Sequence, residues 1–214
     1  MIVVISGLIG VGKTSLCEAI CKDLGALGFY EPVESNEFLN PYLADHTKYS
    51  FGMQMNLLYA RTDAFEDAVK ASKRHDELCI CDRSMYEDWA FADVQHVMGY
   101  MDDLHFKCYE KWHKRFVDSM PLPDLILNLK ASLETIKARQ VERNRDGEDC
   151  YDETYNRALM DAYDRLMPRL ACKCPVVDID AEQSKEDVLK DALNAINRRR
   201  LEFNLMKPVY HGGY

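Results

Sequence analysis

The stretch that decides the fold stands at the start of the chain, where residues 1–15 read MIVVISGLIGVGKTS. Residues 2–6 are predicted to form a strand buried on both faces, because they open with a continuous apolar run. Residues 7–14 match the pattern GxxxxGK(S/T) and lead into a helix predicted over residues 13–24. Glycines let the backbone N–H groups of such a loop turn inward around phosphate oxygens, and the helix N-terminus adds positive potential. The stretch therefore predicts a site for a nucleoside triphosphate.

The side chains of this loop fit the same chemistry. Lys13 would neutralise the β- and γ-phosphates, and the hydroxyl of Thr14 would reach Mg²⁺. The residues expected to bind the nucleotide are Gly7, Gly10, Val11, Gly12, Lys13, Thr14 and Ser15. The loop alone leaves the acceptor of the phosphoryl group open, since water, a nucleoside, a nucleotide and a protein all fit it.

Further along the chain, short apolar runs alternate with helical patterns. The predicted strands are Phe29–Tyr30, Leu78–Cys81, Leu125–Leu129 and Val176–Ile179. Helices are predicted over residues 53–71, 86–120 (with a break near Gly99), from 132 onward, 151–170 and 184–200. This alternation predicts an α/β fold with a parallel sheet covered on both faces. No repeat or linker divides the chain, so a single domain over residues 1–214 is expected.

The composition narrows the classes of protein. Of the 214 residues 47% are apolar and 29% are charged, which excludes collagen-like, coiled-coil and disordered chains. Lys and Arg number 27 against 36 Asp and Glu, and the net charge of −9 disfavours nucleic-acid binding. No apolar run approaches the roughly 20 residues of a membrane span. With no secretory signal, the eight cysteines are expected as reduced thiols in the cytoplasm.

Two further motifs stand where strands end. Asp82 and Arg83 follow a predicted strand, and functional groups gather at the carboxyl ends of parallel strands. Asp82 would hold Mg²⁺ directly or through water, and Arg83 would contact phosphate oxygens. Glu31 follows another strand and would take a proton from an attacking hydroxyl. Taken alone, Asp82 and Arg83 also fit a helix N-cap followed by a surface arginine, and Glu31 also fits a solvated glutamate at a strand end.

A cluster of arginines follows the third long strand. Arg139 and Arg143 are four residues apart on one helical face, and Arg145 and Glu148 come directly after them. Fixed cations of this kind would clamp the charge of a γ-phosphoryl group, in a lid that closes on ATP. Acidic residues are interspersed, so a solvated charged helix is the other interpretation of this run.

Together these motifs resemble the deoxynucleoside kinase family, over most of the chain from Met1 to about Glu182. The resemblance rests on the combination of the phosphate loop with E-P-V at residues 31–33, D-R-S at 82–84 and the arginine run. It implies a three-layer P-loop kinase fold, a parallel sheet flanked by helices with an arginine-rich lid over about residues 139–150. It also implies ATP as phosphoryl donor with Mg²⁺, and a homodimer formed through the long helices near residues 53–71 and 86–120.

The resemblance assigns roles to individual residues. Glu31 matches the presumed general base on the nucleoside 5′-hydroxyl, Gln54 the group that binds the base edge, and Arg61 and Asp88 the pair that completes base recognition. The expected catalytic residues are Glu31, Arg83 and Lys13. Glu148 matches the group that holds the sugar 3′-hydroxyl. The lid arginines Arg139, Arg143 and Arg145 match cations at the ATP phosphates, and the acidic loop with Asp180 would border the adenine.

One region departs from the family pattern. The segment from Asn40 to Gln54 is a few residues shorter than in bacterial members, where a tyrosine contacts the sugar. Tyr42 is the candidate for that contact, with Tyr49 as second choice.

The residues and the resemblance together predict an ATP-dependent kinase acting on the 5′-hydroxyl of a deoxynucleoside. Through the Arg61/Asp88 pair, the resemblance implies deoxycytidine and purine deoxynucleosides in preference to thymidine. The first alternative is a nucleoside monophosphate kinase of the thymidylate type. That acceptor already carries a phosphate, which Glu31 would repel and for which Arg83 alone offers little positive charge. The second alternative is a regulator that binds the nucleotide without turnover.

Overall fold

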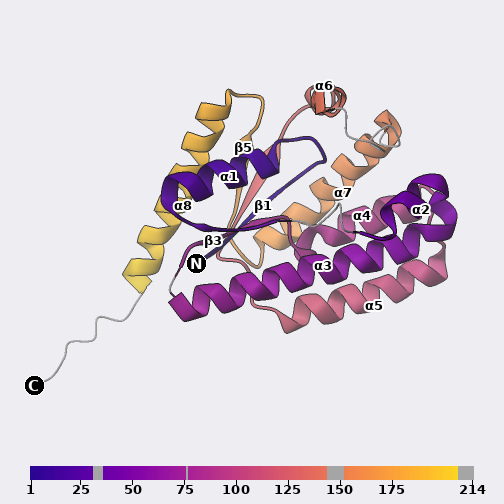
Figure 1. The fold of residues 1–214 in the computed structure, drawn as a ribbon, viewed down its shortest axis with the longest axis horizontal. Helices are drawn as coiled ribbons and strands as arrows, with labels where there is room; N and C mark the ends of the chain where they lie inside the picture. The colour runs from indigo at the N-terminus through magenta and orange to yellow at the C-terminus, as the bar shows by residue number, and fades with distance from the viewer. Residues whose placement is uncertain (31–35, 76, 144–151, 207–214) are drawn as a thin grey trace, which may run out of the picture.

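The computed structural model describes residues 1–30, 36–75, 77–143 and 152–206. Over these residues the elements alternate as the sequence predicts (Figure 1). The strands are β1 (Ile2–Gly7), β2 (Leu27–Phe29), β3 (Cys79–Asp82), β4 (Leu125–Lys130) and β5 (Val176–Asp180). The helices are α1 (Lys13–Leu24), α2 (Leu39–Ala44), α3 (His46–His75), α4 (Met85–Val97), α5 (Asp103–Ser119), α6 (Leu133–Arg143), α7 (Glu153–Ala171) and α8 (Lys185–Met206).

The strands form one parallel sheet in the order β2-β3-β1-β4-β5. β1 lies in the middle, with Val3 opposite Ile80 of β3 and opposite Leu125 of β4. All six residues of β1 are buried, as expected for a strand covered on both faces. Its carboxyl end, where the glycine loop begins, therefore lies at the centre of the sheet edge, where parallel α/β sheets place ligands.

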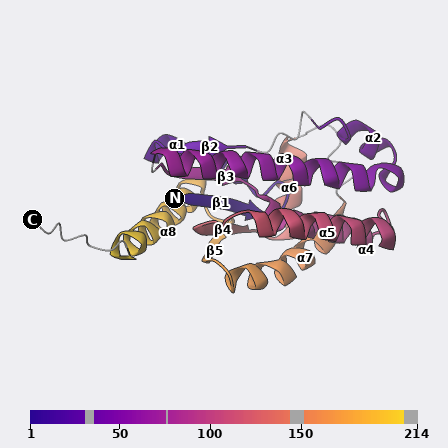
Figure 2. The same cartoon turned by 90° about the horizontal axis from the view of Figure 1, so that it is seen from below.

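Helices cover both faces of the sheet, which makes three layers (Figures 1 and 2). Val3 and Ile5 belong to the core that α1 and α8 form on one face. Ile2 and Val4, whose side chains alternate to the other side, belong to the core with α3, α4, α5 and α7. None of the described helices is long and apolar enough to cross a membrane.

Two helices differ from the sequence prediction. Residues 40–41, expected as a turn, lie inside α2, where Pro41 falls in the first turn and needs no N–H donor for the helix. α3 begins at His46, seven residues before the predicted start at residue 53, and it includes Gly52 although glycine is a poor helix former. A Cβ at Gly52 would stand 2.4 Å from the ring of Phe38, so this glycine lets the ring pack directly on the helix backbone. The predicted break near Gly99 is confirmed, because it separates α4 from α5.

Candidate active site

The glycine loop after β1 has a backbone that ordinary side chains disfavour. The φ angles of Gly7, Gly10 and Gly12 are 139°, 88° and 106°, all in the region that favours glycine. Lys13 is the first residue of α1, and its Nζ donates a hydrogen bond of 2.7 Å to the carbonyl oxygen of Leu8. Its ammonium group is thus held against the loop, at the helix N-terminus where anions bind.

A cavity of about 530 Å³ lies on the outer side of this loop. Loop residues 10–15 form one wall, and α6 and the connection from β5 to α8 form the others. The residues that line it are Gly10, Val11, Gly12, Lys13, Thr14, Ser15, Leu16, Ala19, Leu129, Arg139, Glu142, Arg143, Ala181, Gln183, Lys185 and Val188. The volume lies within the range of small-molecule sites, and the walls combine apolar groups with cations and backbone amides.

The structure brings the two predicted arginines of α6 to this cavity. Arg139 donates to the carbonyl oxygen of Val11 at 3.1 Å and to that of Ala181 at 2.8 Å, so it ties the glycine loop to the segment after β5. Arg143 also lines the cavity. Asp180 is not among the lining residues, and its carboxylate accepts from the backbone N–H of Glu182 at 2.9 Å. The residues that border the cavity from this segment are Ala181, next to Asp180, together with Gln183 and Lys185, which the sequence did not indicate.

α6 is joined to the loop by a second contact that the sequence did not indicate. Gln140 donates from its amide to the carbonyl oxygen of Ile9 at 3.0 Å. Gln140 and Asn156 of α7 exchange amide hydrogen bonds of 3.1 and 3.3 Å, and both side chains are buried. The arginines of α6 are therefore carried by a helix that is hydrogen-bonded to the loop and to α7.

Thr14 and Asp82 meet at the ends of α1 and β3. The Thr14 hydroxyl donates to Asp82 Oδ2 at 2.5 Å, and Asp82 is only 7% exposed. A hydroxyl and a carboxylate are the hard oxygen ligands that Mg²⁺ prefers. The described residues hold no cluster of three or more Asp, Glu, His or Cys that would enclose a metal. This donor set fits Mg²⁺, because that ion usually takes one or two protein oxygens and completes its shell with phosphates and water.

Arg83 is held by a buried network at the start of α4. Its φ of 72° is unusual for a residue other than glycine, and such strain tends to occur at functional sites. Its Nη1 donates to three acceptors: the carbonyl oxygen of Gly7 at 3.1 Å, Glu87 Oε1 at 2.8 Å and the Tyr163 hydroxyl at 2.8 Å. The Ser6 hydroxyl donates to the other oxygen of Glu87. Burial raises the pKa of the Glu87 carboxyl, while the nearby cations, Arg83 first, oppose that rise.

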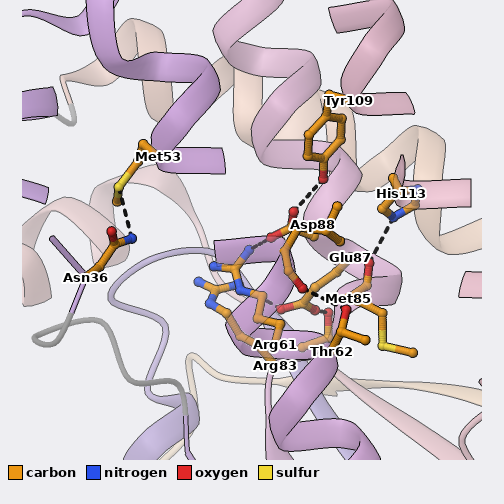
Figure 3. Close-up of polar contacts among 12 residues, drawn as sticks. Asn36, Met53, Arg61, Thr62, Arg83, Met85, Glu87, Asp88, Tyr109 and His113 are labelled. Atoms are coloured by element: carbon orange, nitrogen blue, oxygen red, sulfur yellow. Dashed lines mark hydrogen bonds and ion pairs between the residues drawn. The ribbon is translucent and has the colours of Figure 1, made fainter. Parts of the chain in front are cut away.

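Arg61 and Asp88 form the predicted ion pair. Arg61 of α3 donates to Asp88 Oδ1, and the side chains are 4% and 0% exposed. The guanidinium carbons of Arg61 and Arg83 lie 4.9 and 4.7 Å from the centre of the Phe91 ring. Figure 3 shows the two guanidinium groups next to each other. The consecutive residues Glu87 and Asp88 therefore each compensate one arginine of a buried pair.

Gln54 lies on α3, two helical turns before Arg61. Its side chain is 2% exposed, and among the described residues its Oε1 has no hydrogen-bond donor. A buried amide oxygen without a donor costs about 1–3 kcal/mol, so a bound group that donates to it would be stabilised. Residues seven apart lie on the same helical face, so Gln54 and Arg61 face the same side of α3.

The remaining predicted residues divide into two groups. Tyr42 of α2 is 2% exposed and packs with Met53 and Leu57, while Tyr49 packs against the edge of this cluster. Contact of either ring with a sugar stays a prediction. Glu31, Arg145 and Glu148 lie outside the described residues.

The sequence did not indicate Glu87, Tyr109 or Tyr163. A signal existed for Glu87, which stands four residues after Arg83 and so on the same helical face. The two tyrosines carry no such signal, because they reach the site only through the packing of α5 and α7 against α4.

The glycine loop, the Thr14–Asp82 pair and the parallel sheet define a P-loop kinase. Comparison with known proteins identifies the family: a model of the deoxynucleoside kinase family matches residues 3–199. The chain belongs to this family and is a deoxynucleoside kinase, as its motifs predict, rather than a monophosphate kinase or a regulator without turnover.

Relatives and solved structures agree with this assignment. Deoxyadenosine kinase of Dictyostelium discoideum is 33% identical over 178 residues, which cover 83% of this chain and 71% of the relative. Deoxyguanosine kinase of the same organism is 30% identical over 172 residues, covering 80% of this chain and 60% of the relative. A structure of deoxyadenosine kinase from M. mycoides with dCMP and dCDP bound matches with a TM-score of 0.83 at 27% identity, over 92% of this chain and all of that one. The predicted α/β fold is confirmed.

Proposed function

We propose that this kinase transfers the γ-phosphoryl group of ATP to the 5′-hydroxyl of a deoxyadenosine, deoxyguanosine or deoxycytidine substrate. The observation that carries the proposal is the buried set of Gln54, Arg61 and Asp88, in which the Gln54 Oε1 atom accepts no hydrogen bond from the described residues. A glutamine amide and a carboxylate–guanidinium pair together offer donors and acceptors side by side, which is what the edge of a nucleobase requires. The relatives named above are kinases of deoxyadenosine and deoxyguanosine.

The donor nucleotide fits the cavity over the glycine loop. Lys13 and the loop N–H groups would bind its phosphates, and Arg139 and Arg143 would border it from α6. Thr14 and Asp82 would hold Mg²⁺, which when bound neutralises charge on the transferred phosphoryl group. The M. mycoides enzyme has also been solved with dATP bound, which supports a nucleoside triphosphate at this type of site.

Arg83 would contact the phosphoryl group during its transfer from ATP to the 5′-hydroxyl. It lies beside the first glycine of the loop, bonded to the Gly7 carbonyl oxygen, and its orientation is fixed by Glu87 and Tyr163. Glu31 as the group that orients or deprotonates the 5′-hydroxyl, Glu148 at the 3′-hydroxyl and Arg145 at the phosphates stay predictions from the sequence. Asp180 at the adenine stays a prediction as well.

The experiment that tests the proposal is an ATP-consumption assay with Mg²⁺ against the four deoxynucleosides and their monophosphates. We expect turnover with deoxynucleosides that carry an amino group on the base and slower turnover with thymidine. Gln54→Leu should raise the KM for the deoxynucleoside about tenfold, for the loss of roughly 1–1.5 kcal/mol of hydrogen bonding, and leave the KM for ATP unchanged. Lys70→Met is the matched control on α3, because Lys70 is half exposed and pairs with the surface carboxylates of Glu66 and Asp67. Turnover of monophosphates alone would contradict the proposal.

We infer further that two copies associate through α3 and α5. Tyr59 of α3 is 62% exposed, and Leu104 and Trp112 of α5 are 76% and 50% exposed. Leu104 and Trp112 are two turns apart on one face of α5, so they form an apolar stripe. We expect light scattering to give a dimer for the natural chain and a monomer for Trp112→Glu.

A cytoplasmic location stays a prediction.

A further inference from the structure

Tyr109 makes a buried contact to which the proposed function assigns no role. Its hydroxyl donates to Asp88 Oδ2, while Arg61 donates to Asp88 Oδ1 (Figure 3). Asp88 and Tyr109 are both 0% exposed, so water does not substitute for either partner. We propose, on the basis of the function proposed above, that Tyr109 is a positioning residue that determines which bases the kinase accepts, by fixing the Asp88 carboxylate as an acceptor toward the base.

The tyrosine is the donor in this contact. Burial, and then the charge of Asp88, raise the pKa of the Tyr109 phenol well above its ordinary value, so the hydroxyl keeps its proton. Both oxygens of Asp88 thus accept hydrogen bonds from protein donors that come from two different helices. A carboxylate held in this way has one orientation, and its remaining lone pairs have fixed directions.

The ring of Tyr109 is itself held in place. It stacks on the His113 ring with 5.8 Å between centroids and 20° between planes. The Nε2 atom of His113 lies 2.9 Å from the carbonyl oxygen of Met85, the first residue of α4. α5 therefore contacts the first turn of α4 at two points, and Figure 3 shows both of them beside the Arg61–Asp88 pair.

Loss of the hydroxyl has a defined consequence for Asp88. A buried carboxylate oxygen without a donor is unfavourable, and among the described residues the Arg61 guanidinium already donates to the other oxygen of Asp88. Asp88 would turn both oxygens toward Arg61 in a bidentate pair. The base then loses an Asp88 oxygen as its hydrogen-bond acceptor, and the Arg61 guanidinium changes its direction. The glycine loop and the cavity for ATP are unaffected. Recognition of the base is therefore expected to weaken without a change in ATP binding.

A purely structural role makes a different prediction. Tyr86 of α4 is also buried and donates to the carbonyl oxygen of Pro121 at 2.7 Å, on a contact that does not involve Asp88. Tyr86→Phe thus removes one buried tyrosine hydroxyl from the same core and serves as the matched control. If tyrosine hydroxyls act only by stabilising the fold, both variants will lower the melting temperature and neither will change substrate selectivity.

The test is steady-state kinetics of the natural chain, Tyr109→Phe and Tyr86→Phe with deoxyadenosine, deoxycytidine and thymidine. We expect Tyr109→Phe to raise the KM for the preferred deoxynucleoside about tenfold and to reduce its kcat/KM advantage over thymidine by a similar factor. The KM for ATP should change less than twofold, and Tyr86→Phe should keep the natural selectivity. An unchanged KM and selectivity in Tyr109→Phe would overturn the inference.

A second measurement separates an effect that acts through Asp88 from a general effect of the substitution on the fold. In an Asp88→Asn background, Tyr109→Phe should produce no further loss of selectivity, because it acts through the carboxylate. Additive effects would show that Tyr109 acts by another route and would refute the proposal. A natural chain that phosphorylates no deoxynucleoside contradicts the proposed function itself, whereas an active natural chain with an unaffected Tyr109→Phe contradicts only the role of Tyr109.

Discussion

The buried pair of Arg61 and Asp88 leads to a prediction about stability that is independent of any assay of activity. Both side chains are inside the protein, at 4% and 0% exposure, so removal of one partner takes a buried counter-charge away from the other. Such a loss typically costs about 3–5 kcal/mol, compared with about 0–1 kcal/mol for a surface pair. We expect Arg61→Met and Asp88→Leu each to lower the free energy of unfolding by an amount in the buried range.

The double variant Arg61→Met/Asp88→Leu should recover most of this loss. Replacing both members of a buried pair by apolar groups of similar volume is often close to neutral. One cost remains, since the Tyr109 hydroxyl then lacks an acceptor, and an unsatisfied buried group costs about 1–3 kcal/mol. The interaction energy of the mutant cycle should therefore be at least about 2 kcal/mol.

Urea unfolding followed by tryptophan fluorescence measures these free energies, provided that the slope with denaturant is the same in all four proteins. Lys114→Met is the control, because the Lys114–Asp118 pair has side chains that are 74% and 56% exposed. It should be indistinguishable from the natural chain. Additive losses in the double variant, or a loss below about 1 kcal/mol for Arg61→Met, would refute the claim that this pair is a mutually compensated buried unit.

Three further predictions concern the network around the phosphate loop. Burial raises the pKa of Glu87 in the folded chain above its ordinary 4.5, so the natural chain loses stability as the pH rises from 4.5 through the raised pKa. The melting temperature of Glu87→Gln should therefore rise relative to that of the natural chain as the pH increases. A difference in melting temperature that is constant with pH would contradict this. Gly10→Ala places a Cβ 2.9 Å from Gln140 Cγ and should cost about 1–3 kcal/mol in urea unfolding with weaker ATP binding. Gly99→Ala, also at positive φ but in open space, should cost less and bind ATP normally. Asn156→Leu breaks the amide pair with Gln140 and should weaken ATP several-fold in calorimetry without affecting deoxynucleoside binding; equal weakening of both ligands would argue against this local role.

Local sequence patterns were sufficient for the elements that carry the phosphate site. The first strand, the glycine loop and the helix over residues 13–24 are found at the predicted positions, because a buried strand, glycines at positive φ and a helix start leave strong local signals. The helix boundary at His46 and the short helix α2 were missed, since they depend on the packing of Phe38 against Gly52, which is a contact between separate elements.

The candidate site follows the same division. The pairing of Arg61 with Asp88 was expected from the family resemblance and is confirmed by the ion pair. The contacts of Tyr109 and Tyr163 were not predictable, because each joins α4 to a helix whose register against α4 is set by the whole core. That the Gln54 Oε1 atom has no donor among the described residues likewise becomes visible only once the burial of α3 is known.

The first turn of α4 links the two ends of the proposed acceptor site. Glu87 compensates the arginine proposed for the phosphoryl group and Asp88 compensates the arginine proposed for the base, and both guanidinium groups lie over the ring of Phe91 one turn further on. Because these counter-charges are consecutive residues of one helix, helix geometry, and not the conformation of a loop, sets the separation of the two arginines. The groups proposed to recognise the base then come from α3 and α5. Substitutions in these two helices can change which base is accepted, while Arg83 keeps its position beside the phosphate loop.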